Sequence, residues 1–200
     1  MQDYRRFKSI LDQHDFFIKN KEMTVWGSVN DEDEQRIIEL TEMASEIPGP
    51  IIEVGGLFGL TTQLIATYKP QDKRLISIEN FSWNPFGLPK QDHKTIMERV
   101  LRYNIMHSNT EIYDGNKKDF YNSFKGETPA MVFIDADHSY QSVMNDIEWA
   151  QQNKIPLICG HDYCELHPSV KAAVNESFGE DIQVKGTIWS HCSLSMKNSQ

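Results

Sequence analysis

From Pro50 onward, short apolar runs alternate with segments of helical periodicity, and this alternation most constrains the fold. Strands that are apolar on both faces and separated by helices are typical of a parallel sheet with helices on both sides. The predicted strands are Ile51–Val54, Arg74–Ile78, Glu111–Tyr113, Ala130–Ile134 and Ile155–Cys159. The predicted helices of this region cover 59–68, 92–104, 117–124, 139–151 and 168–178.

The end of the chain has a different pattern. Ile182–Val184 and Thr187–His191 are two short strand-like runs joined by Lys185 and Gly186, which is typical of an antiparallel hairpin with a tight turn. The sequence therefore predicts an α/β fold with a mostly parallel sheet of seven strands and a terminal antiparallel hairpin.

The segment before Pro50 has helical periodicity. Residues 1–20 predict an amphipathic helix, residues 21–30 contain Trp26 and break the pattern, and a second helix is expected over 31–47. We expect one domain over residues 1–200, with N-terminal helices in 1–48 that form a candidate lid and a core in 50–192. A lid would exclude water from a reaction below it.

Composition narrows the class of protein. Twenty basic and 29 acidic residues give a net charge of −9, which argues against a nucleic-acid partner. No apolar run approaches the ~20 residues of a membrane span. Three cysteines, an odd number, cannot all pair within the chain, so we expect a cytoplasmic protein.

A glycine-rich turn follows the first predicted strand, in the order Glu53-Val54-Gly55-Gly56-Leu57-Phe58-Gly59-Leu60-Thr61. In parallel sheets, ligands bind at the carboxyl ends of the strands, and glycine lets the backbone turn sharply there. The dinucleotide fingerprint G-x-G-x-x-G ending at Gly59 would require glycine at position 54, where Val54 stands. The glycine-rich turn is therefore either part of a nucleoside cofactor site or a plain strand-to-helix turn.

Glu79 ends the second predicted strand, 20 residues after Gly59. A carboxylate there is placed to accept hydrogen bonds from ribose hydroxyls. The alternative is a surface acid without a ligand.

This combination resembles the class I S-adenosylmethionine-dependent methyltransferases from about residue 50 onward. The stretch from Glu53 to Thr61 is similar to their first motif, Glu79 to their ribose-binding acid, and Tyr113–Asn116 to the segment that contacts adenine. The resemblance implies a three-layer Rossmann-like fold and S-adenosylmethionine as the cofactor. The implied cofactor-binding residues are Glu53, Gly55, Gly56, Gly59, Thr61, Glu79, Asn80, Asp114, Gly115, Asn116 and Asp135.

Two downstream segments, Met131–Tyr140 and Gly160–Tyr163, resemble the branch of small-molecule O-methyltransferases described as methyltransferase domain 24. The same layout occurs in macrolide-sugar O-methyltransferases. The resemblance implies methyl transfer to a hydroxyl of a small molecule, with a sugar or a glycosylated metabolite as the candidate acceptor. A homo-oligomer is compatible with it. The alternatives are a non-catalytic cofactor-binding module and, less well supported, a nicotinamide oxidoreductase.

Acidic residues and histidines follow the fourth and fifth predicted strands. His138 is the candidate base because histidine titrates near neutral pH, although it could instead be a helix-start residue. Asp135 is a candidate catalytic residue that would orient the cofactor. Asp135 and Asp162 are also candidate ligands of Mg²⁺ or another divalent cation. Metal-dependent relatives have an acid pair after the fifth strand, whereas His161 and Tyr163 flank Asp162 here.

The loop from Asn80 to Pro89 is rich in aromatic residues and helix breakers. Flat aromatic walls suit a sugar, an aromatic acceptor or adenine. The alternative is a small hydrophobic cluster under a loop.

Overall fold

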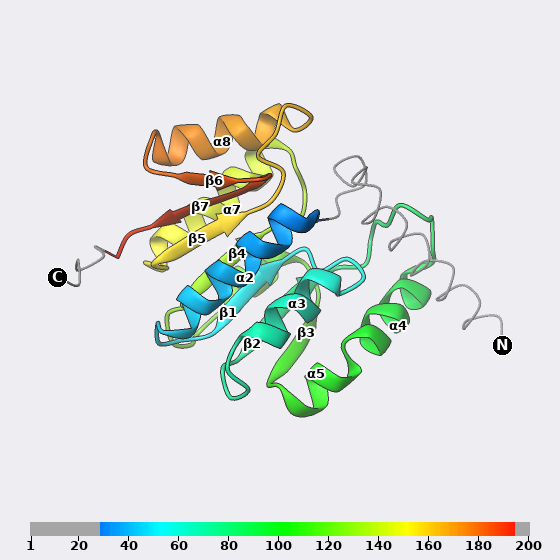
Figure 1. Ribbon diagram of the computed structural model, residues 1–200. Coiled ribbons are helices and arrows are strands. Elements are labelled where there is room, and N and C mark those ends of the chain that lie inside the picture. The colour runs from blue at the N-terminus through cyan, green and yellow to red at the C-terminus, as the bar shows by residue number, and fades with distance from the viewer. Residues whose placement is uncertain (1–28, 195–200) are drawn as a thin grey trace.

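The computed structural model describes residues 29–194, so the predicted first helix and Trp26 lie outside the described residues (Figure 1). The helices are α2 (Asp31–Ser45), α3 (Leu60–Tyr68), α4 (Lys90–Val100), α5 (Arg102–His107), α6 (Lys117–Ser123), α7 (Tyr140–Gln152) and α8 (Pro168–Phe178). The strands are β1 (Ile51–Val54), β2 (Leu75–Glu79), β3 (Thr110–Asp114), β4 (Met131–Ile134), β5 (Leu157–Gly160), β6 (Gln183–Lys185) and β7 (Ile188–Cys192).

The strands form one sheet of seven in the order β3-β2-β1-β4-β5-β7-β6. The first five strands in this order are parallel, whereas β7 pairs antiparallel with both β5 and β6. The predicted sheet and terminal hairpin are confirmed. Strand order reverses between β1 and β4, where Val54 pairs with Ile134, and ligands of such sheets bind beside that point.

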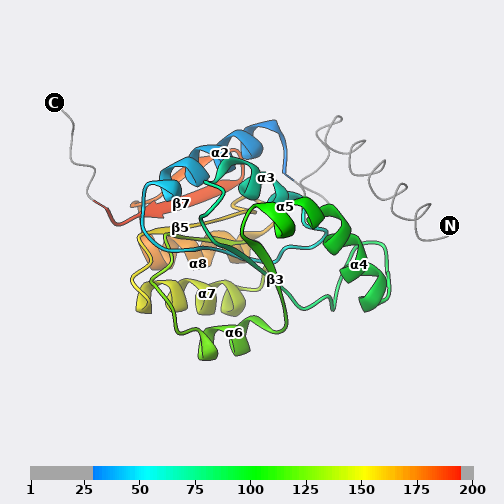
Figure 2. The same ribbon diagram turned by 90° about the horizontal axis from the view of Figure 1, so that it is seen from below.

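Helices cover both faces of the sheet, with α2, α3 and α5 on one side and α6, α7 and α8 on the other (Figure 2). Successive side chains of a strand point to opposite faces, so Ile51 packs with the α2 and α3 layer while Ile52 packs with the α7 and α8 layer. Both faces are therefore buried, which explains the continuous apolar runs. Among the described residues, no helix is long and apolar enough to cross a membrane.

Helix α2 begins with a capping box. The Asn30 side chain accepts from the backbone N–H groups of Glu32 and Asp33, and the Asp33 carboxylate accepts from the backbone N–H of Asn30. The helix ends at Ser45, two residues earlier than predicted, before Pro48.

The prediction of one continuous helix over 92–104 is wrong, because the chain forms two helices, α4 and α5, with Leu101 between them. Leu101 is fully buried with Phe81 and Met97. A Cβ at Gly59 would lie 3.0 Å from the Leu101 Cγ. The break therefore coincides with a tightly packed contact beneath the glycine turn.

Candidate active site

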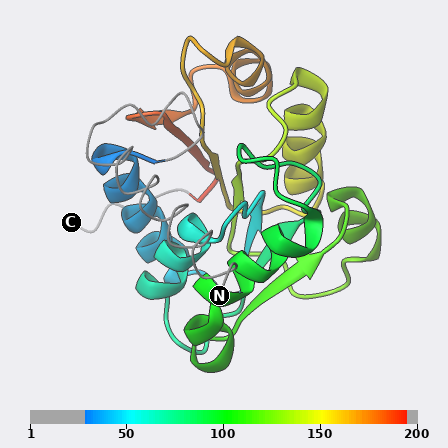
Figure 3. The ribbon, with the colours of Figure 1, turned by 90° about the vertical axis from the view of Figure 1, so that its right-hand side faces the viewer.

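A cavity of about 980 Å³ lies at the carboxyl ends of the strands, where the strand order reverses. Figure 3 shows this end of the molecule, with α2 (blue) and α8 (orange) on different sides. The cavity is lined by the glycine turn, the ends of β2 and β4, the start of α6 and the start of α7. Of the predicted cofactor residues, those that line it are Gly55, Gly56, Thr61, Glu79, Asn80, Gly115, Asn116 and Asp135.

The glycine turn is dictated by packing between strand ends as well as by room for a ligand. Gly55 has φ +98°, and a Cβ there would lie 1.9 Å from the carbonyl oxygen of Asp135. Gly59 has φ +84° at the start of α3 and lies behind the cavity wall. Glycine tolerates such backbone angles and close approaches. Gly59 is therefore a structural residue of the turn. It was predicted to bind the cofactor, but it does not line the cavity.

Glu79 holds two loops together at the cavity wall. One carboxylate oxygen accepts from the backbone N–H of Leu57 at 2.9 Å, and the other accepts from the backbone N–H of Phe81 at 2.8 Å. Leu57 and Phe81 both have positive φ. Each carboxylate oxygen can accept a further hydrogen bond, so Glu79 can still bind hydroxyls of a ligand.

Two of the predicted cofactor residues, Glu53 and Asp114, do not line the cavity. Glu53 is fully buried and accepts hydrogen bonds from the hydroxyls of Thr62 and Ser77, the latter at 2.5 Å. Burial raises the pKa of Glu53 to about 7. Asp114 lies 3.0 Å from Lys90 Nζ. Both side chains therefore form hydrogen bonds or ion pairs outside the cavity.

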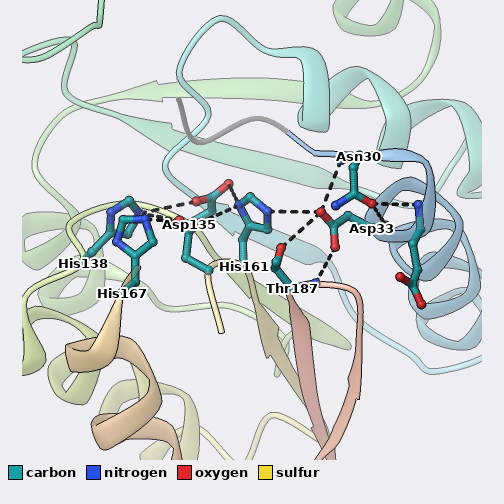
Figure 4. A network of polar contacts seen from close by, with 9 residues as sticks. Asn30, Asp33, Asp135, His138, His161, His167 and Thr187 are labelled. Atoms are coloured by element: carbon teal, nitrogen blue, oxygen red, sulfur yellow. Dashed lines mark hydrogen bonds and ion pairs between the residues drawn. The ribbon is translucent and has the colours of Figure 1, made fainter. Parts of the chain in front are cut away.

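His138 lines the cavity and faces two carboxylates (Figure 4). Its Nε2 lies 2.8 Å from Asp162 Oδ2 and 3.8 Å from Asp135 Oδ1. The carboxylates of Asp135 and Asp162 raise the pKa of His138 to about 10. In this arrangement the imidazole is protonated at neutral pH, which differs from the expected neutral base.

His161 is buried among three carboxylates. Its Nε2 lies 3.5 Å from Asp33 Oδ2, and its Nδ1 lies 3.6 Å from both Asp135 Oδ2 and Asp162 Oδ1. Burial lowers the pKa of His161, but the surrounding carboxylates outweigh it and hold that pKa well above its usual value. Burial likewise opposes ionisation of Asp135, but His161 and His138 hold the pKa of Asp135 below its usual value.

Asp33 extends this network to α2 and the terminal hairpin. Its carboxylate accepts from the backbone N–H of Thr187 at 2.6 Å and from the Thr187 hydroxyl at 3.1 Å. Figure 4 shows the continuous row from Asn30 through Asp33, His161 and Asp135 to His138. Sequence reasoning missed Asp33, because a helix-capping pattern explains an acid at that position.

Asp162 is fully buried, with φ +61° in the left-handed region. Neither of its carboxylate oxygens accepts a hydrogen bond of good geometry from any residue of the described range. His167 Nε2 lies 3.6 Å from Asp162 Oδ1, and the His167 ring packs against the His138 ring at 4.4 Å between centroids. His167 lies just before α8 and lines the cavity. Sequence reasoning missed it, because only the fold brings it to His138.

The predicted Mg²⁺ ligands Asp135 and Asp162 lie together with His161, and one ligand atom of each lies within 4.8 Å of the others. The third side chain of this group is an imidazole, whose Nδ1 lies 3.6 Å from both carboxylates. Mg²⁺ prefers oxygen ligands in near-ideal octahedral geometry. The predicted pair of ligands is therefore not confirmed.

The loop of residues 80–89 contributes Asn80, Ser82 and Trp83 to the cavity wall. The Trp83 side chain is 65% exposed, whereas Phe81 is buried in the core. Both predictions for this loop therefore apply to part of it. Phe81 belongs to a hydrophobic cluster under the loop, and Trp83 lies beside the cavity.

Comparison with known proteins agrees with this fold. The family model described as a methyltransferase domain matches residues 52–163, and none of the curated proteins matches the chain in sequence. The O-methyltransferase from Bacillus cereus in complex with S-adenosylhomocysteine is 16% identical, with 92% of this chain and 90% of that chain covered and a TM-score of 0.64. The O-methyltransferase TomG from Streptomyces achromogenes, in complex with S-adenosylmethionine, is 17% identical, with 84% and 82% covered and a TM-score of 0.61.

A third similar structure is CalS11, described as a TDP-rhamnose 3′-O-methyltransferase of calicheamicin biosynthesis. It is 13% identical, with 96% of this chain and 93% of that chain covered and a TM-score of 0.62. The matched family segment contains the glycine turn, Glu79, Asp135, His138 and Asp162. The chain therefore belongs to the methyltransferase domain family, of the class I S-adenosylmethionine-dependent type.

Proposed function

We propose that the protein transfers a methyl group from S-adenosylmethionine to a hydroxyl of a small molecule. The observation that carries this proposal is that one cavity, at the point where strand order reverses, has the glycine turn and Glu79 on one side and Asp135 and His138 on the other. A volume of about 980 Å³ is at the upper end of the range of roughly 300–1,000 Å³ for small-molecule sites, so it has room for two ligands.

The residues on the β1 and β2 side fit a nucleoside. Gly55 and Gly56 line the cavity wall, and the Glu79 carboxylate is fixed by two backbone N–H groups. Asn116, at the start of α6, follows the neighbouring strand β3, whose Asp114 pairs with Glu79, and also lines the cavity. Bound there, S-adenosylmethionine would supply an electrophilic methyl group on a sulfonium.

The residues on the β4 and β5 side fit an acceptor whose hydroxyl must lose a proton. Asp135 lies at the end of β4, lines the cavity and has a carboxylate that remains partly exposed. We assign the proton-accepting role to Asp135 and the orientation of the acceptor oxygen to His138, whose protonated ring can donate a hydrogen bond. This revises the expectation that His138 is the base.

A sugar or a glycosylated metabolite is the acceptor class that we favour. The partly exposed Trp83 offers an aromatic face beside polar groups, which suits a sugar ring. The structural similarity to CalS11, which is described as acting on TDP-rhamnose, supports the same class.

The test is a screen of hydroxylated acceptors with S-adenosylmethionine, in which formation of S-adenosylhomocysteine and a methylated product is followed by mass spectrometry. We expect turnover with at least one glycoside. Binding of S-adenosylhomocysteine without turnover of any acceptor would favour the non-catalytic module, and failure to bind it would overturn the proposal.

A further inference from the structure

We propose that His138, Asp162 and His167 form a binding site for a divalent transition-metal ion, such as Zn²⁺, rather than for Mg²⁺. The role of the ion in the reaction rests on the proposed function. Binding of the ion is argued from the geometry alone. The three side chains come from the loop after β4, the loop after β5 and the start of α8.

The donor atoms converge on one point. One ligand atom from each of the three side chains lies within 4.8 Å of the others. Ligands at the ~2.0–2.2 Å bond lengths of metal-bound imidazole and carboxylate lie at most about 4.4 Å apart around one ion, so small side-chain shifts would complete the set. Two histidines and one carboxylate with open positions form a recognised set for transition metals.

The Asp162 carboxylate is the second, independent observation. The side chain is fully buried, yet neither oxygen has a hydrogen bond of good geometry within the described part of the chain. Asp162 Oδ2 lies 2.8 Å from His138 Nε2, and Asp162 Oδ1 lies 3.6 Å from His167 Nε2, but neither N–H group is aligned for a hydrogen bond. Buried carboxylates are normally paired, hydrogen-bonded or bound to metals, and this geometry favours a shared cation.

The ligand types select the ion. Two of the three donors are imidazole nitrogens, which suit Zn²⁺, whereas Mg²⁺ and Mn²⁺ prefer oxygen ligands. Asp162 lies behind the cavity wall, and His138 and His167 line the cavity. The remaining coordination positions therefore face the space assigned to the acceptor. Because a metal-bound imidazole is neutral, the ion would replace the proton of His138, and in that state the ion rather than His138 would orient the acceptor oxygen. The ion would lower the pKa of a bound hydroxyl, whose proton Asp135 is placed to accept.

The experiment titrates Co²⁺, a spectroscopic substitute for Zn²⁺, into the chelator-treated full chain and follows visible absorption, together with calorimetric titration of Zn²⁺, Mn²⁺ and Mg²⁺. We expect one Co²⁺ per chain, and Zn²⁺ to displace it while a large excess of Mg²⁺ does not. His167→Ala should weaken Co²⁺ binding by more than about 100-fold, since loss of a direct ligand exceeds the effect of an outer partner.

His107→Ala, at an exposed histidine of α5, is the matched control and should bind Co²⁺ like the unmodified chain. Thermal unfolding shows whether each variant folds, and Asp162→Asn repeats the test at the buried ligand. Unchanged Co²⁺ binding in both ligand variants, or displacement by Mg²⁺ as effective as by Zn²⁺, would overturn the proposal. S-adenosylhomocysteine binding by the chelated chain tests the proposed function separately, so the two proposals can fail independently.

Discussion

The two sides of the cavity are built in different ways. On the β1 and β2 side, backbone groups and the Glu79 carboxylate satisfy one another through hydrogen bonds of 2.8–2.9 Å. Behind the wall on this side, Glu53 and His93 each leave one side-chain atom without a hydrogen bond to a described residue, while their other atom is bonded. On the β4 and β5 side, both polar side-chain atoms of Asp162 and both of His161 are buried without an aligned hydrogen bond to any described residue. Unsatisfied buried polar groups cost free energy, and such sites tend to be functional. The difference indicates a pre-formed cofactor side and a charged side arranged for ligands.

The largest expected effect is on the backbone-built side. Gly55→Val should lower the free energy of unfolding by more than about 4 kcal/mol, because its Cβ would meet the Asp135 carbonyl oxygen at 1.9 Å in a strained backbone conformation. Urea unfolding measures this. Gly87→Ala is the control, since at φ +61° its Cβ would meet no described atom within 4 Å and only a backbone cost of about 1–2 kcal/mol is expected. Equal losses in the two variants would contradict the packing argument.

On the charged side, Asp33→Ala should lower the free energy of unfolding by about 3–5 kcal/mol, since it removes one of the carboxylates around buried His161 and the acceptor for Thr187. Chemical denaturation of Asp33→Ala and Asp33→Asn measures the loss, and the amide should retain part of the stability by accepting from Thr187. Asp31→Ala, at an exposed acid of the same helical turn, should change it by less than about 1 kcal/mol. A loss at Asp31 as large as at Asp33 would show that only the helix start matters.

Glu53 gives a pH-dependent prediction for the wall behind the glycine turn. Burial raises its pKa from 4.5 to about 7, so the folded chain holds this proton more tightly than the unfolded chain does. The resulting stability is present below about pH 4.5 and is lost as the pH rises through about 7. The advantage of Glu53→Gln over the unmodified chain in free energy of unfolding should therefore grow by roughly 3–4 kcal/mol as the pH rises from below about 4.5 to above about 7. A difference that does not vary with pH in denaturant titrations would refute the role of burial.

The smallest expected effect on stability is at Trp83, beside the cavity. Trp83→Ala should raise the KM of an identified acceptor several-fold and change the free energy of unfolding by less than about 0.5 kcal/mol, because the side chain is 65% exposed. Steady-state kinetics would measure the change. Tyr103→Ala, at an exposed aromatic residue of α5, should leave the KM unchanged. A similar KM in both variants would exclude Trp83 from the acceptor site.

Local patterns were enough to predict the sheet, its terminal hairpin and the position of the cavity. Apolar runs mark strands buried on both faces, and glycine with a following acid marks the ends of β1 and β2. The charged cluster could not be predicted as fully, because Asp33, Asp135, Asp162 and His167 are brought together only by tertiary packing. The positions of Glu53 and Asp114 outside the cavity lining could not be predicted for a related reason, since sequence position near a strand end does not reveal which way a side chain points.

The most direct test of the account is calorimetric titration of S-adenosylhomocysteine into the unmodified chain, Glu79→Ala and His167→Ala. If the two sides of the cavity are distinct, Glu79→Ala should weaken binding by about 10- to 150-fold, which corresponds to roughly 1.5–3 kcal/mol for hydrogen bonds to a charged group. His167→Ala should leave the dissociation constant within about twofold. Unchanged binding in Glu79→Ala, or an equal loss in His167→Ala, would contradict the assignment of cofactor and acceptor to opposite sides.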